Sequence, residues 1–241
     1  MRWVWDRTQR FRMRPEYTSE ELDEKCQALV SDYLRRKHGE ASFPIRTADL
    51  RLFVEMESES LTLDARLGQE GGGEVEACTE FRRGHKPAVK IASSLAQVPS
   101  LEKRLRAVLA HQYGHVRFHD FLFQTEEGSW LSLFEGLPDT RPRLHRCRRD
   151  SMMPLGDDDW MEWQAGYVCG ALLMPIGPLV AHVRDFRHAR DLDHAALSER
   201  SLDGAALIRE VAERFQTSWD TARTRLAQQR ILAPDDTRSL F

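Results

Sequence analysis

The sequence predicts an α+β fold, on the basis of three observations along its 241 residues. Apolar residues recur at helical spacing near both ends and in two central segments. Between them, residues 60–92 contain three short runs typical of β-strands. Hydrophobic residues make up 41% and charged residues 30% of the chain, as in ordinary globular proteins. Such a chain is long enough for one large domain, or for a core domain with an appendage.

The first predicted helix covers residues 18–39. Thr18 and Glu21 form a capping-box pattern, apolar residues follow at helical spacing, and Gly39 ends the element. Gly71–Gly73 is predicted as a flexible turn that joins the first two strands, and it lacks the Lys-Ser/Thr ending that a phosphate loop would need. Around it we expect a short second helix and three strands, at residues 42–56, 60–67, 74–83 and 87–92.

A long helix is predicted after Pro99, with Ser100 as its cap and an apolar face that leads into His111. Residues 121–158 then break into Gly, Pro, Asp and Arg, so we predict a long insertion that forms a wall or lid of a functional cleft. The alternative is a disordered surface loop without a partner. Helical character resumes after the acidic run at 157–159 and ends at Pro175. The last part of the chain predicts two short helices around a turn at residues 216–218.

Charge and cysteine content exclude several classes of protein. The net charge of −3 is not that of a dedicated nucleic-acid binder, and the basic runs "MRWVWDRTQRFRMR" and "RPRLHRCRR" are predicted as a solvated arm and a solvated loop. No signal peptide or membrane span is apparent, so we expect a cytoplasmic protein. The four cysteines are widely spaced without CxxC, which favours buried free thiols. Cys147, in "HRC", is left open as a thiolate that caps zinc.

His111 and His115 lie four residues apart on the predicted central helix. This spacing projects both imidazoles from one face, close enough to share one tetrahedral ion. We choose Glu162, at the start of the next long helix, as the third ligand, which leaves a fourth position open. His119 is rotated by about 80° from His111, so a straight helix cannot bring it to the same ion. We expect it to support a ligand or to face the substrate.

Two segments carry a resemblance to a known family. "AVLAHQYGHVRFH" and "EWQAGYVCGALLMP" resemble the ImmA/IrrE family of zinc metallopeptidases, whose pattern is AHELGH…H followed by E-x-x-A-N-x-F-A-x-x-L-L-M-P. "VAERFQTSWDTARTRL" is similar to the helix-turn-helix-like tail of these proteins, so the resemblance covers residues 43–232. It implies a zincin-like domain with a small sheet and two ligand-bearing helices. The residues that match the second motif in register are Glu162, Ala165, Leu172, Leu173, Met174 and Pro175.

The resemblance also implies site residues and a domain organisation. His111, His115 and Glu162 match the family's zinc ligands, and Gln112 stands at the general-base position. We therefore predict an N-terminal basic arm and helix at residues 1–40. A zinc peptidase domain follows at 41–185, with its insertion at 121–158. A helix-turn-helix-like region ends the chain at 186–241.

Two residues depart from the family pattern. Gly166 replaces an Asn or Asp that helps to orient a metal-bound histidine. Gln112 replaces the glutamate that accepts a proton from water, and an amide cannot do so. We predict zinc binding without useful peptide hydrolysis. The intact remainder of the site favours an engineered Glu-to-Gln change; the alternative is a natural pseudopeptidase that acts as a zinc-containing binding or regulatory module.

Family members typically act inside bacterial cells by cleaving a helix-turn-helix repressor or a comparable regulator, often encoded beside them. They thereby switch on mobile-element, stress or phage-defence genes. By resemblance, the expected partner is such a regulator or a co-encoded effector. The C-terminal helices have two interpretations, a DNA-reading module or a helical support for the peptidase. The net acidity favours the support, so direct DNA binding and membrane association are not expected.

Overall fold

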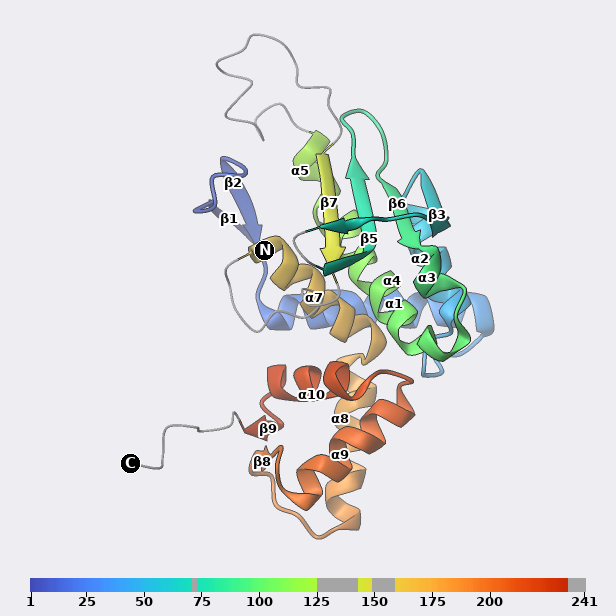
Figure 1. Ribbon diagram of the computed structural model, residues 1–241. Coiled ribbons are helices and arrows are strands. Elements are labelled where there is room, and N and C mark those ends of the chain that lie inside the picture. The colour runs from blue at the N-terminus through green and yellow to red at the C-terminus, as the bar shows by residue number, and fades with distance from the viewer. Residues whose placement is uncertain (71–72, 125–142, 149–158, 234–241) are drawn as a thin grey trace. The chain divides into compact units, whose positions relative to one another are not determined.

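The computed structural model describes residues 1–70, 73–124, 143–148 and 159–233 (Figure 1). The chain forms two compact units, one of residues 1–22 with 46–169 and one of residues 23–45 with 170–241. These units do not coincide with the predicted boundaries at 40 and 185. The reason is that two continuous helices, α1 (Ser19–His38) and α7 (Trp160–Leu173), each run from one unit into the other.

The first unit is built on a mixed β-sheet, in agreement with the predicted α+β class. Its strands follow the order β3-β6-β5-β4, and β7 also pairs with β5. The β3–β6 pair is parallel and the other pairs are antiparallel. The three strands predicted between residues 60 and 92 are confirmed, whereas two glycines of the predicted turn, Gly71 and Gly72, lie outside the described residues. The strand bounds are β3 Ser60–Ala65, β4 Gln69–Glu70, β5 Gly73–Phe81, β6 Ala88–Ala92 and β7 Arg143–Arg148.

Strand β7 corrects the sequence prediction, because the "RPRLHRCRR" segment was expected to be a solvated loop. Arg143–Arg148 instead pairs with β5 over six registered positions. Leu144 and Arg146 are exposed, whereas Cys147 is buried, so the side chains alternate as a half-buried strand requires. The arginines on the outer face hid this alternation in the sequence. The apolar run "GSWLSLFEGL" and the rest of the insertion on either side of β7 lie outside the described residues.

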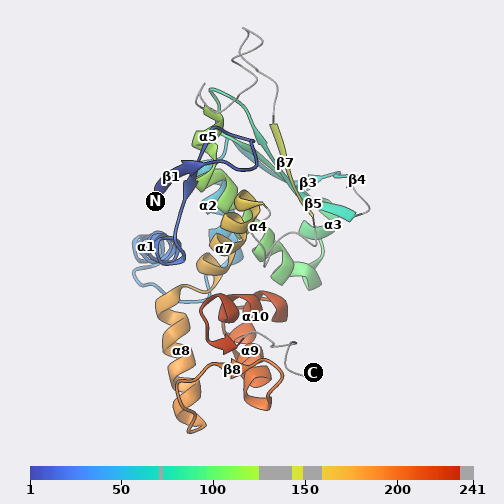
Figure 2. The same cartoon turned by 90° about the vertical axis from the view of Figure 1, so that its left-hand side faces the viewer.

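Helices α2 (Thr47–Glu57) and α4 (Glu102–Phe118) lie together on one face of the sheet (Figure 2). Every residue of α4 from Leu105 to Val116 is buried. The predicted cap is wrong, since Pro99–Leu101 forms the short 3₁₀ helix η1 and α4 begins without a side-chain cap. Two further short helices were not predicted, α3 (Ser93–Ala96) and α5 (Asp120–Gln124); α5 is the first part of the predicted insertion.

The N-terminal segment also corrects a prediction, because it is folded rather than a solvated arm. Strands β1 (Arg2–Trp5) and β2 (Met13–Glu16) form an antiparallel hairpin. Phe11 is only 1% exposed and packs edge-on against Phe123 and Trp160. The arginines suggested solvation, but the aromatic residues between them bury apolar surface, which is the stronger effect.

The second unit contains helices and one small parallel strand pair. Its elements are α8 (Ile176–Ala189), β8 (Leu197–Ser198), α9 (Leu202–Arg214), α10 (Trp219–Gln228) and β9 (Leu232–Ala233). Helices α9 and α10 confirm the predicted pair around a turn, where Gln216 adopts a φ of 53°. Ser201 and Ser218 cap the two helices through their side chains.

Two sequence predictions about helices are also tested. The capping box at the start of α1 is confirmed: the Thr18 and Glu21 side chains each accept a hydrogen bond from the other residue's backbone N–H. No single helix among the described residues is long and apolar enough to cross a membrane, although α7 and α8 pass that test as a pair bent by 62°.

Candidate metal centre

Three predicted ligands converge in the first unit. His111 and His115 project from one face of α4, and Glu162 projects from the first turn of α7. The two Nε2 atoms lie 3.1 Å apart. The Glu162 oxygens lie 3.3 Å from His111 Nε2 and 3.4 Å from His115 Nε2. The 3.3 Å contact is made by Oε2 and the 3.4 Å contact by Oε1, so each imidazole nitrogen faces one oxygen of the same carboxylate. The three residues predicted as ligands are therefore brought together.

The spacing of these ligand atoms is compatible with a zinc ion. Zinc bonds of about 2.0–2.1 Å in a tetrahedron place neighbouring ligand atoms about 3.3–3.4 Å apart. The contacts of 3.3 and 3.4 Å fall in that range, and the contact of 3.1 Å between the two nitrogens lies slightly below it. The cluster is buried, and the Oε2 atom of Glu162 has no hydrogen-bond partner among the described residues. A cation at the centre would satisfy this atom.

Close packing of α4 on α7 produces the convergence. A Cβ atom added at Gly114 would lie 2.9 Å from the Cα of Ala165 and 3.2 Å from its Cβ. Only a glycine can therefore occupy this position without moving a helix. Gly114 immediately precedes His115, and Ala165 follows Glu162 by three residues, so this contact sets the distance between the ligands.

The protonation states of the cluster suit a metal. Burial lowers the pKa of His115 well below its ordinary value, which keeps the ring neutral at pH 7. Burial alone would raise the pKa of the Glu162 carboxyl, but the three histidine rings around it outweigh burial and hold that pKa far below the ordinary value. Neutral imidazole and ionised carboxylate are the forms that bind zinc.

Gln112 lies at the expected general-base position and is fully buried. Its Oε1 accepts a hydrogen bond of 2.5 Å from the hydroxyl of Thr79 on β5. Its Nε2 has no hydrogen-bond partner among the described residues. The side chain thus contributes a free donor, whereas a glutamate in its place would contribute an acceptor.

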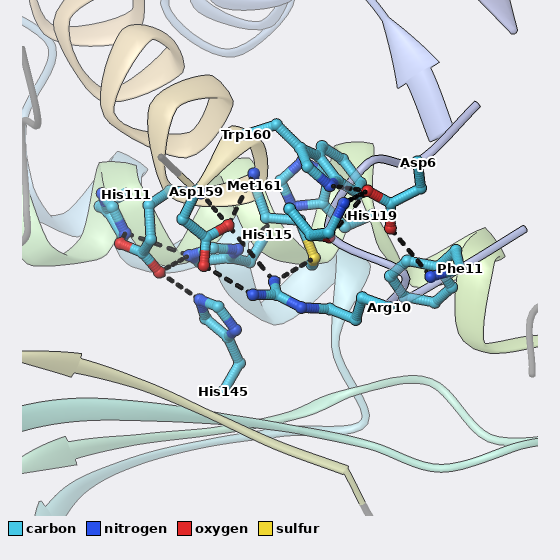
Figure 3. Close-up of polar contacts among 12 residues, drawn as sticks. Asp6, Arg10, Phe11, His111, His115, His119, His145, Asp159, Trp160 and Met161 are labelled. Carbon is cyan, nitrogen blue, oxygen red and sulfur yellow. Dashed lines mark hydrogen bonds and ion pairs between the residues drawn. The ribbon is translucent and has the colours of Figure 1, made fainter. Parts of the chain in front are cut away.

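His145 is a site residue that the sequence analysis missed. It extends from β7 toward the helices (Figure 3), and its Nε2 donates a hydrogen bond to Oε1 of Glu162. Its ring centre lies 4.1 Å from that of His115. In the β5–β7 pairing it is opposite Thr79, so one cross-strand pair supplies groups to both Glu162 and Gln112. The alternation of "RLHRC" was the available signal.

His119 does not belong to the cluster of described residues that can hold a metal, in agreement with the rotation argument. It is the first residue after α4, and burial lowers its pKa to about 3. Its Nδ1 lies 3.1 Å from Nδ1 of His115, and its Nε2 lies 3.0 Å from Oε1 of Gln164. It therefore contacts a ligand from behind. Gln164 had not been singled out in the sequence.

The N-terminal segment holds the first turn of α7, which carries Glu162. Asp159 caps this helix by accepting from Met161 N, and Arg10 donates to both carboxylate oxygens of Asp159 (Figure 3). Trp160 Nε1 donates to Asp6 at 3.1 Å. Residues at positions 6–10 thus help to place a ligand more than 150 positions later in the chain.

All four cysteines are free and buried, as predicted. Cys147 does not belong to the cluster of described residues that can hold a metal. Burial raises the pKa of its thiol well above the ordinary value, so the metal-free protein carries the neutral thiol. The open interpretation of Cys147 as a zinc cap is therefore not supported.

Comparison with known proteins gave no further assignment: no protein-family model and no curated protein matches the chain.

Proposed function

We propose that this chain is a zinc-binding protein of metallopeptidase type, and that the form with Gln112 binds its protein partner without cleaving it. The observation that carries the proposal is the buried cluster of His111, His115 and Glu162, whose nitrogen and oxygen atoms approach one another to 3.1, 3.3 and 3.4 Å. A zinc ion bound there would supply Lewis acidity, which polarises a carbonyl group and acidifies water.

The chain's own residues determine what this chemistry can accomplish. Peptide hydrolysis needs a group that accepts a proton from water and delivers it to the leaving amine. At the appropriate position Gln112 offers an amide that is fixed by Thr79 and exposes only its N–H donors. It can orient a carbonyl or a water molecule, but it cannot accept the proton.

The proposed partner is a helix-turn-helix regulator or a co-encoded effector, an inference that rests on the ImmA/IrrE resemblance. The second unit supports a scaffolding role for the C-terminal helices. Both arginines of α10 already pair with acidic side chains of the same unit: Arg223 with Glu199 at 3.2 Å, and the buried Arg225 with Asp23. A DNA-reading helix would present such residues to phosphates or bases instead.

The experiment that tests the proposal compares the chain with Gln112→Glu. Zinc content is measured after dialysis, and hydrolysis is measured on fluorogenic casein and on a quenched-peptide library. Both forms should retain stoichiometric zinc. Hydrolysis should rise by about 10²- to 10⁴-fold in Gln112→Glu and disappear with a chelator. The matched control, Gln112→Glu with His115→Ala, should neither retain zinc nor cleave. The proposal would be contradicted if neither the chain with Gln112 nor Gln112→Glu retained zinc.

His145 favours a second candidate function, a zinc module that never hydrolyses peptides. A catalytic zinc site keeps one position open, whereas a structural site is closed by protein groups. Since His145 contacts Glu162 and lies 4.1 Å from the His115 ring, it crowds the side of the site that faces the sheet. Two results together would support this second function. Gln112→Glu would retain zinc but cleave nothing, and the double variant Gln112→Glu/His145→Ala would cleave.

A further inference from the structure

A network of buried, hydrogen-bonded polar groups extends from the ligand His115 to the N-terminal hairpin. It consists of His119, Gln164 and the backbone carbonyl of Pro15 on β2. His115, His119 and Gln164 are each at most 1% exposed, so water does not compete for their hydrogen bonds. The donors and acceptors in this network can be assigned one after another, starting from the one group whose role is fixed.

The group with the fixed role is the carbonyl oxygen of Pro15, which can only accept. Gln164 must therefore direct its Nε2 toward it, and this hydrogen bond measures 2.8 Å. The same amide then presents Oε1 to His119, whose Nε2 lies 3.0 Å away. Because an amide oxygen only accepts, the ring proton of His119 resides on Nε2.

The remaining hydrogen bond of the network, between His119 and His115, follows from the neutral ring of His119. With its proton on Nε2, His119 has a lone pair on Nδ1, which accepts from Nδ1 of His115 at 3.1 Å. His115 then carries its own proton on Nδ1, so its Nε2 is bare and directed at Glu162 and His111. The opposite order would place a proton on Nε2 of His115, where the cation would have to bind.

We propose that Gln164 and His119 are positioning residues that set the tautomer of His115 for metal binding, with the Pro15 carbonyl as the reference acceptor. The proposal rests on the zinc site proposed above. It assigns a function to the N-terminal hairpin, whose backbone fixes the ring that holds the ion. Groups that orient a metal-bound histidine in this way typically change metal affinity by about 10- to 100-fold when removed.

The test uses the full protein with Gln164→Met, which keeps the side-chain length but replaces the amide oxygen that accepts from His119 by a weakly accepting sulfur. Histidine-ring ¹⁵N NMR on the metal-free protein should show His115 protonated on Nδ1 in the parent chain and a mixture of tautomers in Gln164→Met. Zinc affinity, measured by competition with a chelating dye, should fall by about 10- to 100-fold. The matched control is Gln27→Met, which removes a glutamine hydrogen bond to Gly177 N in the other compact unit and should change neither measurement.

A second pair of variants tests His119 directly. His119→Asn keeps an oxygen near the position of Nδ1 and should preserve the His115 tautomer and most of the zinc affinity. His119→Phe keeps a ring without an acceptor and should lose both. A parent chain with His115 protonated on Nε2, or equal zinc affinities for the parent, Gln164→Met and His119→Phe, would overturn the proposal. Absence of zinc from the parent protein would instead contradict the proposed function. The tautomer measurement would still test whether Gln164 and His119 set the tautomer of His115.

Discussion

The contact between Gly114 and Ala165 makes a sharp prediction about the metal site. In Gly114→Ala, the new methyl group would lie 2.9 Å from the Ala165 Cα, whereas ordinary contacts begin near 3.4 Å. Restoring ordinary contact would therefore separate α4 and α7 by about 0.5 Å at this point. A backbone atom cannot swing aside as a flexible side chain can, so the helices themselves must move.

This separation exceeds what the metal site tolerates. Ligand distances in a zinc site are held to about 0.2 Å, and the contact lies one residue from His115 and three from Glu162. We expect zinc affinity to fall at least about 10-fold, as it does when a group that orients a ligand is lost. The free energy of unfolding is a poorer measure, because two contributions oppose each other. Overpacking lowers it by about 1–3 kcal/mol, and replacing a helical glycine by alanine raises it by about 1 kcal/mol.

The assay is chelator competition for zinc on the parent chain, Gly114→Ala and the control Gly68→Ala. A methyl group added at Gly68 would meet open space, so this replacement should leave the affinity unchanged. The double variant Gly114→Ala/Ala165→Gly removes the 3.2 Å contact with Cβ but keeps the 2.9 Å contact with Cα, so it should recover affinity only in part. Parental affinity in Gly114→Ala would refute the idea that this helix contact sets the ligand geometry.

Two further predictions concern buried groups. Asp23→Ala should lower the free energy of unfolding by about 3–5 kcal/mol in urea titrations, because it removes the carboxylate that pairs with the fully buried Arg225. Asp185→Ala, which breaks an exposed pair, should change it little. The thiols should be inert to a disulfide reagent at pH 8, since all four are buried and burial raises the pKa of Cys26 to about 12. All four should react in guanidinium, and rapid labelling of the native chain would contradict the buried assignment.

Local patterns predicted the elements whose signals lie within a few residues. Thr18, Glu21 and Gly39 delimit α1 as expected, and the histidine spacing placed both imidazoles on one face of α4. The period-two pattern of β7 was hidden, because solvent-facing arginines made Arg143–Arg148 look like a loop. In the N-terminal segment the apolar contacts of Phe11 are with residues more than 100 positions away, which no local pattern reveals.

The residues of the candidate site also fall into two groups, those that the sequence predicted and those that it missed. The triad of His111, His115 and Glu162 could be predicted because the ligand types and helical spacing are visible in the sequence. His145 and Gln164 were missed. The role of His145 depends on the register of β7, which only the alternation of "RLHRC" hinted at, and the role of Gln164 depends on a backbone carbonyl brought near by folding. Sequence reasoning finds side chains that act through their own chemistry more readily than those that act through a neighbour.

The most direct test of the account is X-ray absorption at the zinc edge on the purified chain after dialysis. We predict stoichiometric zinc with a coordination shell of nitrogen and oxygen at about 2.0–2.1 Å and the scattering pattern of imidazole rings. Glu162→Ala should bind zinc much more weakly, without loss of the folded state. A chain that retains no zinc, or a shell that contains sulfur at about 2.3 Å, would contradict the assignment of His111, His115 and Glu162 as the ligands.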